Sequence, residues 1–219
     1  MTTHLALIRN ATQTLIDHVD ELTALDQAIG DGDHGLNMKR GAQAIQAKEA
    51  ELAGQSLNDA LRTMGMTCMS TIGGSSGPVF GTLLITLAKE LPASDPGPSD
   101  LARALDAAIK ALTRLGKAEV GQKTLLDVLA PVQLLLSGAG PDGRGDSALV
   151  ERVRDGAIAA AQATAQMDAI KGRASFLGER AYGHVDPGSR SMALIIAAIG
   201  ETLLNRSSLS SPTASAGAA

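Results

Sequence analysis

The stretch Asp26-Gln-Ala-Ile-Gly30-Asp31-Gly-Asp33-His34-Gly35-Leu36-Asn37 interrupts an otherwise helical pattern near the amino end of the chain. Its three carboxylates repel one another unless a cation offsets their charge. The interspersed glycines let the backbone curl so that the carboxylates converge. Oxygen ligands of this kind suit a hard cation such as magnesium, calcium or manganese. The sequence therefore predicts a metal site on Asp26, Asp31 and Asp33.

An EF-hand and a solvated acidic turn are the two other interpretations of this stretch. An EF-hand that begins at Asp31 requires a glutamate at its twelfth position, where Ala42 stands, so this class of site is excluded. A solvated acidic turn that caps the following helix stays open from the spacing alone. His34 and Asn37 begin that helix, and a helix N-terminus offers N–H groups to an anion such as phosphate.

Apolar residues recur at helical spacing on both sides of this stretch, and the Ala-rich, Val-poor composition favours helices over strands. We expect an all-α protein with eight or nine helices in one domain, residues 1–206, followed by an uncharged, Ser- and Ala-rich disordered tail, residues 207–219. The expected helices are residues 3–22, 36–53, 57–70 after Ser56, 78–90, a fifth capped by Ser99, 124–136, a helix capped by Ser147 that ends near 167, and 189–205, with a short helix within 171–188.

Polar, glycine-bearing segments fall between these helices at 26–35, 73–77, 116–121 and 171–188. In an up-and-down array of helices, alternate loops share one end. We therefore expect these four loops to meet at one rim and to form a site there.

The segment Gly73-Gly-Ser75-Ser76-Gly77 is a second candidate anion site, because successive small residues expose backbone N–H groups. It also fits the Gly-x-Ser-x-Gly elbow of α/β-hydrolases, with Asp168 and His184 following in the order of a triad. That elbow requires a preceding strand and a parallel sheet, which this composition disfavours. A plain turn between helices stays open.

Composition argues against several classes of function and location. The net charge is −4, and the only aromatic residues are Phe80, Phe176 and Tyr182, so we expect no nucleic-acid partner. The single cysteine, Cys68, is expected to be a small buried hydrophobe in a reducing compartment. No signal peptide is expected, and the longest apolar run is too short to span a bilayer, which favours a cytoplasmic protein without a membrane partner.

Four segments taken together, 26–38, 73–82, 116–131 and 172–188, resemble the nucleotide-binding (L) subunit family of dihydroxyacetone kinases, in the same order. The resemblance implies an antiparallel eight-helix barrel with the nucleotide at one rim. It implies that Asp26, Asp31 and Asp33 bind two Mg²⁺ ions that bridge the phosphates of ADP or ATP. The residues that it implies in nucleotide contact are His34, Gly35, Leu36, Asn37, Ser75, Ser76, Arg173, Asp186 and Pro187, with Gly116 and Leu125 around the adenine.

The same resemblance implies a kinase subunit that transfers a phosphoryl group to a small ketose held on a separate dihydroxyacetone-binding subunit. The phosphate donor is either a phosphohistidine protein of the phosphotransferase system or free ATP. Erythrulose as a related substrate, a Mg–ADP-dependent regulator that binds a transcription factor, and a domain recruited to a fatty-acid kinase are the alternatives. Whether the chain forms a homodimer is left open by the sequence.

Overall fold

The computed structural model of the chain describes residues 3–93, 95–139 and 146–210, and within these ranges all regular secondary structure is helical, which confirms the all-α class. The α-helices are α1 Thr3–Asp17, α2 Val19–Ile29, α3 His34–Gln46, α4 Glu49–Ala53, α5 Leu57–Thr71, α6 Ser76–Glu90, α7 Pro98–Gly116, α8 Leu126–Ser137, α9 Ser147–Ala163 and α10 Pro187–Ser210. Two 3₁₀ segments, η1 Thr164–Gln166 and η2 Arg173–Ala181, connect α9 to α10.

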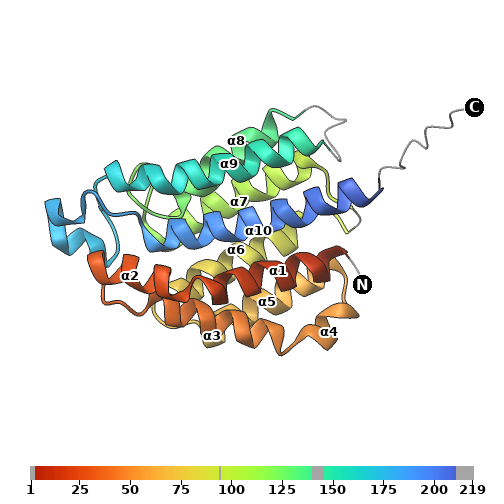
Figure 1. Cartoon of the computed structure of the whole chain (residues 1–219), viewed down its shortest axis with the longest axis horizontal. Helices are drawn as coiled ribbons and strands as arrows, with labels where there is room; N and C mark the ends of the chain where they lie inside the picture. The colour runs from red at the N-terminus through yellow and green to blue at the C-terminus, as the bar shows by residue number, and fades with distance from the viewer. Residues whose placement is uncertain (1–2, 94, 140–145, 211–219) are drawn as a thin grey trace, which may run out of the picture.

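The long helices lie side by side along the longest axis of the molecule (Figure 1). Going around this axis, each helix packs on the next in the order α1, α3, α5, α6, α7, α8, α9, α10, and α10 packs back on α1. The ring is therefore closed, and it fits the expected eight-helix barrel. The loops before α3, α6, α8 and α10 lie at one end, on the left in Figure 1, and α4 lies toward the other end.

Leucine, methionine and alanine make up most of the interior, and Cys68 is buried among them, as expected. Small residues bring α5 and α6 close together. A Cβ atom on Gly81 would lie 2.9 Å from the carbonyl oxygen of Gly65 and would also meet the side chain of Met69. Glycine at this crossing lets the two helix backbones approach each other.

Several helix ends differ from the expected ones. The first expected helix breaks at His18, whose ring nitrogen Nδ1 lies 2.8 Å from the carbonyl oxygen of Thr14. The second breaks after α3, before the short α4. Gly97, not Ser99, is the N-cap of α7, because Pro98 lacks an N–H group and suits the first turn of a helix.

Asp146, not Ser147, caps α9, since its carboxylate accepts a hydrogen bond from the N–H of Ala148 at 2.9 Å. The N-cap expected at Ser56 is confirmed, because its Oγ accepts the N–H of Asp59.

At the carboxyl end, α10 continues to Ser210, so residues 207–210, expected in the tail, have a helical backbone. The rest of the expected tail, 211–219, lies outside the described residues. Among the described helices, none is both long enough and apolar enough to cross a membrane.

We expect Gly81→Ala to lower the free energy of unfolding by about 1–3 kcal/mol, because the added methyl group overpacks the crossing of α5 and α6 against a backbone carbonyl. Urea unfolding followed by circular dichroism measures this. Gly54→Ala is the matched control, since a Cβ atom there lies 3.8 Å from the nearest oxygen, in ordinary contact. Equal stabilities of the two variants would contradict the interpretation.

Candidate functional site

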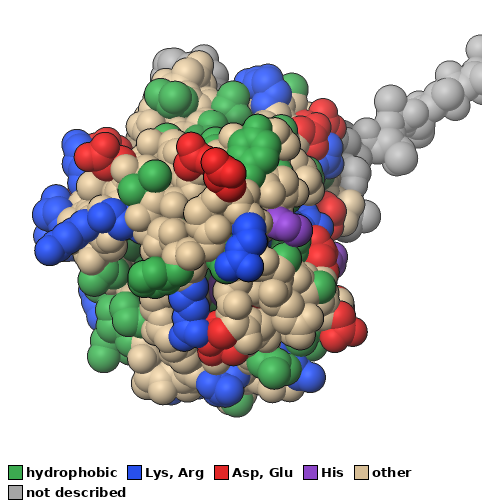
Figure 2. Space-filling view, turned by 90° about the vertical axis from the view of Figure 1, so that its left-hand side faces the viewer, with side chains coloured by type: hydrophobic (Ala, Val, Ile, Leu, Met, Phe, Trp, Pro, Cys, Tyr) green, Lys and Arg blue, Asp and Glu red, His purple; other side chains and the backbone are tan. Residues whose placement is uncertain are grey.

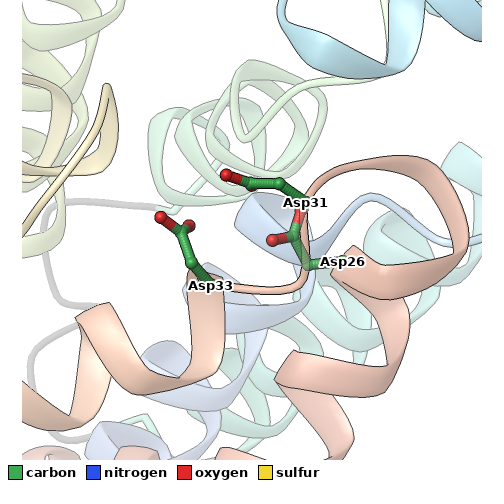
Figure 3. Close-up of side chains that lie close together, drawn as sticks. All are labelled: Asp26, Asp31 and Asp33. Carbon is green, nitrogen blue, oxygen red and sulfur yellow. The ribbon is translucent and has the colours of Figure 1, made fainter.

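The three aspartates of the first loop converge, as predicted. Each offers a carboxylate oxygen, and these oxygens lie within 4.8 Å of one another (Figure 3). Asp26 comes from the last turns of α2 and is buried, whereas Asp31 and Asp33 are exposed. A Cβ atom on Gly30 would collide with the carboxylate of Asp26, so glycine is required where the chain turns. This set of hard oxygen donors fits Mg²⁺.

Local contacts hold two of the carboxylates. Asp26 accepts a hydrogen bond from the backbone N–H of His34 at 3.1 Å. The guanidinium group of Arg173, from η2, forms an ion pair with Asp31. Arg173 was expected on phosphate. Its contact with Asp31 offsets one of three crowded negative charges and brings the fourth loop onto the first.

The imidazole of His34 is buried and bonded through both ring nitrogens. Nε2 lies 2.8 Å from Oγ of Ser191, and Nδ1 lies 3.3 Å from Oγ of Ser76. Ser191 donates its own hydrogen to the carbonyl oxygen of Pro187 at 3.0 Å, so it accepts from Nε2–H. Nδ1 is then the acceptor of the hydroxyl hydrogen of Ser76.

Burial lowers the pKa of His34, and the negative charges of Asp26 and Asp33 oppose this effect only in part. The ring is therefore neutral near pH 7, which matches the hydrogen bonds at both nitrogens.

Three helix N-termini meet at this imidazole. His34 begins α3, Ser76 begins α6, and Ser191 lies in the first turns of α10. Each N-terminus presents backbone N–H groups and the positive end of a helix dipole. Beside the carboxylates, the rim therefore combines ligands for a cation with donors for an anion, which is the arrangement that a metal–polyphosphate requires.

The molecular surface at this end carries basic, acidic and apolar side chains interspersed with one another (Figure 2). No broad field of one sign is visible on this face. What this face offers to an anion is therefore local donors rather than bulk charge, in keeping with the net charge of −4.

The other sequence-predicted residues lie at the same rim. Gly35 is buried with its Cα against Val19 and Thr23 of α2, so it serves close packing of α2 and α3. Leu36 is 55% exposed. Asn37 is buried next to Gly73, where a Cβ atom would lie 2.7 Å from its Oδ1 atom.

Ser75 is the N-cap residue of α6 and is exposed. Gly116 and Leu125 flank the loop between α7 and α8; Gly116 is exposed and Leu125 half-buried. Pro187 is buried as the first residue of α10.

Asp186 caps the N-terminus of α10. Its carboxylate accepts hydrogen bonds from the N–H and the hydroxyl of Ser189, at 2.6 and 2.9 Å. Burial raises the pKa of Asp186 to about 6, while the bonds to Ser189 and the positive charge of Lys123 oppose this rise.

Sequence reasoning missed four residues that hold the rim together. Ser191 and Thr164 gave no signal, because their partners lie far away in the sequence. Lys123 stands between the polar residues Gln122 and Thr124, so its burial also gave no signal in the sequence. Asp127 braces the same loop, since its carboxylate accepts the N–H of Gly121 and, at 2.7 Å, that of Thr124.

The chain is similar in sequence to known proteins of one family. A family model described as the DAK2 domain matches residues 28–201. The chain is 40% identical over 177 residues to the "PEP-dependent dihydroxyacetone kinase, ADP-binding subunit DhaL" of Escherichia coli, which covers 80% of this chain and 84% of that protein. It is 38% identical over 182 residues to the ADP-binding subunit DhaL of PEP-dependent dihydroxyacetone kinase 1 of Listeria innocua, covering 83% of this chain and 86% of that protein.

Among solved structures, the dihydroxyacetone kinase of C. freundii in complex with AMP-PNP and Mg²⁺ matches with a TM-score of 0.71. The match covers 92% of this chain and 34% of that chain at 24% sequence identity, so it bears on the fold.

We expect Mg²⁺ to stabilise the protein through the aspartates. At a Mg²⁺ concentration of 100 times Kd, the gain in unfolding free energy is about 2.7 kcal/mol, and Asp33→Asn removes most of it because one of three anionic ligands is lost. Thermal unfolding with Mg²⁺ and with a chelator measures the gain. Asp106→Asn, at an exposed ion pair with Lys110, is the control that keeps it. An undiminished gain in Asp33→Asn would speak against the site.

Asp186 predicts a pH dependence of stability. Its pKa in the folded chain, about 6, lies above the ordinary value of 3.8, so protonation favours the folded state. This contribution to the unfolding free energy is complete below about pH 4 and is lost as the pH rises through about 6, with a limiting slope of about 1.4 kcal/mol per pH unit. Asp186→Asn does not ionise and keeps an acceptor oxygen.

The unfolding free energy of Asp186→Asn relative to the wild type should therefore rise between about pH 4 and 6. Urea unfolding across this range measures the difference. In the control Asp155→Asn no such rise is expected, because the hydrogen bond from Arg154 lowers the pKa of Asp155. A difference for Asp186→Asn that stays constant with pH would refute the assignment.

Proposed function

Because the chain belongs to the DAK2-domain family, we propose that it is the ADP-binding subunit of a PEP-dependent dihydroxyacetone kinase. One observation carries this proposal: three carboxylates converge beside three helix N-termini at one rim of the barrel. The relatives that share most of their length with this chain are named as such subunits. The chain then holds the nucleotide, and a small ketose is held by a separate dihydroxyacetone-binding subunit.

The aspartates are the ligands of the metal in this proposal. Asp26, Asp31 and Asp33 bind two Mg²⁺ ions, as the family resemblance implies. When bound there, Mg²⁺ would supply positive charge to offset the negative charge that develops on the transferring phosphoryl group. Asp26 is oriented for this role by the N–H of His34.

The phosphates of ADP or ATP lie against the N-termini of α3 and α6 in this arrangement. Backbone donors at Gly35 and Leu36, together with Ser75 and Ser76, face the anion there, while the N–H of His34 holds Asp26. Asn37, Asp186 and Pro187 complete the pocket, and Gly116 and Leu125 contact the adenine. Arg173 is placed on Asp31 by its ion pair, from where its planar guanidinium can fork onto a phosphate oxygen.

No general base for the substrate hydroxyl is assigned to this chain. His34 is neutral and bonded at both ring nitrogens, so it positions helices rather than moving a proton. Phosphoryl transfer depends on positioning and charge neutralisation more than on covalent help. The base therefore belongs to the substrate-binding partner. A phosphohistidine protein of the phosphotransferase system, in the cytoplasm, supplies the phosphate in this proposal.

The test combines binding and turnover. Titration calorimetry of the purified chain should detect ADP binding that requires Mg²⁺ and is lost in Asp33→Asn. Phosphorylation of dihydroxyacetone should appear when the substrate-binding subunit is added, with either the phosphohistidine protein or ATP as donor, and Asp106→Asn should be as active as the wild type. The two donor arms identify the phosphate source.

An absence of Mg²⁺-dependent ADP binding would overturn the proposed function. Binding without turnover in either donor arm, in the presence of an active substrate-binding subunit, would instead favour a Mg–ADP-dependent regulator.

A further inference from the structure

Lys123 is a buried lysine that the proposed function does not use. It lies in the loop between α7 and α8, is 2% exposed, and has a left-handed backbone with φ of 59°. A buried ammonium group and a left-handed non-glycine residue each cost free energy. The surrounding structure must therefore stabilise both.

The partners of the ammonium group explain its burial. Nζ donates hydrogen bonds to the carbonyl oxygens of Thr164 at 2.7 Å and Met167 at 3.4 Å, where the helical segment of α9 and η1 ends. A cation is favourable at the negative end of a helix. Burial lowers the pKa of Lys123, and the negative charges of Asp186 and Asp168 oppose that change.

Thr164 links Lys123 to the start of α10. It is fully buried, and its Oγ1 accepts a hydrogen bond from the N–H of Asp186 at 3.0 Å while donating to the carbonyl oxygen of Ala161. Asp186 in turn caps α10 through Ser189. The side chains of Lys123 and Thr164 together thus connect the α7–α8 loop, the end of α9 and the first turn of α10.

The α7–α8 loop and the start of α10 lie on two different sides of the proposed nucleotide site. Gly116 and Leu125, assigned to the adenine, flank Lys123 in its loop, whereas Asp186 and Pro187 begin α10 on the phosphate side. The first turns of α10 also hold Ser191, the partner of His34 beside the aspartates. A shift of the loop relative to α10 would separate the adenine contacts from the phosphate contacts.

We propose that Lys123 is a positioning residue of the nucleotide site: it holds the α7–α8 loop and the start of α10 in register, so that a nucleoside diphosphate contacts both at once. This inference rests on the proposed nucleotide-binding function. Lys123 acts through the carbonyl oxygen of Thr164 and through Asp186 and does not contact the nucleotide. The three aspartates lie within one segment of the chain, 26–33, and are linked to α10 indirectly, through His34 and Ser191, so we expect metal binding without nucleotide not to depend on Lys123.

The test is Lys123→Met, which keeps an unbranched side chain of similar length but removes the ammonium group. Calorimetry with Mg²⁺ and ADP should give an affinity about ten- to a hundredfold weaker than that of the wild type, the range expected for loss of a charged hydrogen bond. Binding of Mn²⁺ alone, followed by electron paramagnetic resonance, should stay within about twofold, since the aspartates are a separate site.

The control for general destabilisation is Leu52→Ala, a fully buried residue of α4 toward the other end of the barrel (Figure 1). It should lower the melting temperature yet leave ADP affinity within about twofold of the wild type. Thr164→Val is the second variant in case Lys123→Met does not fold. It removes the acceptor of the Asp186 N–H with little change in shape, and it should also weaken ADP binding while leaving Mn²⁺ binding unchanged.

A folded Lys123→Met with wild-type ADP affinity would overturn the inference, as would a loss of Mn²⁺ and ADP affinity by equal factors. If Lys123→Met does not fold, a Thr164→Val variant with wild-type ADP affinity would overturn the inference instead. These outcomes differ from failure of the proposed function, in which the wild-type chain itself does not bind ADP with Mg²⁺.

Discussion

The hydrogen bonds of the His34 imidazole are the contacts on which the rim of the barrel depends. One ring nitrogen bonds to Ser191 of α10 and the other to Ser76 of α6, while the backbone N–H of the same residue holds the carboxylate of Asp26. A neutral imidazole satisfies an acceptor and a donor at once, which an aliphatic side chain could not do. One buried residue thus fixes the positions of three helix N-termini relative to the aspartates.

The site places negative carboxylates next to the positive ends of helix dipoles. Three carboxylates crowd together, which is unfavourable without cations, and helix dipoles of the opposite sign point at the same place. Arg173 adds a positive charge on Asp31. A metal–polyphosphate ligand carries both signs and therefore matches the whole arrangement better than a simple cation or a simple anion does.

Closure of the helical ring provides the rigidity that this arrangement needs. Because α10 packs on α1 as well as on α9, the first and last described helices are held together, and alternate loops are brought to one end. Small residues at helix crossings, such as Gly65 and Gly81, permit the close packing. Buried polar connections, such as Lys123 to Thr164, then fix the loops on the barrel.

The sequence by itself determined the helical class, most helix positions and the convergence of Asp26, Asp31 and Asp33, because apolar periodicity and glycine spacing are local properties. Helix ends were less accurate at His18, Ser99 and Ser147, where side-chain and proline contacts decided the boundary. Only the tertiary structure brought Ser191 to His34, Arg173 to Asp31 and Lys123 to Thr164. These partners are separated by 41 or more residues, and their contacts exist only once the ring of helices has closed.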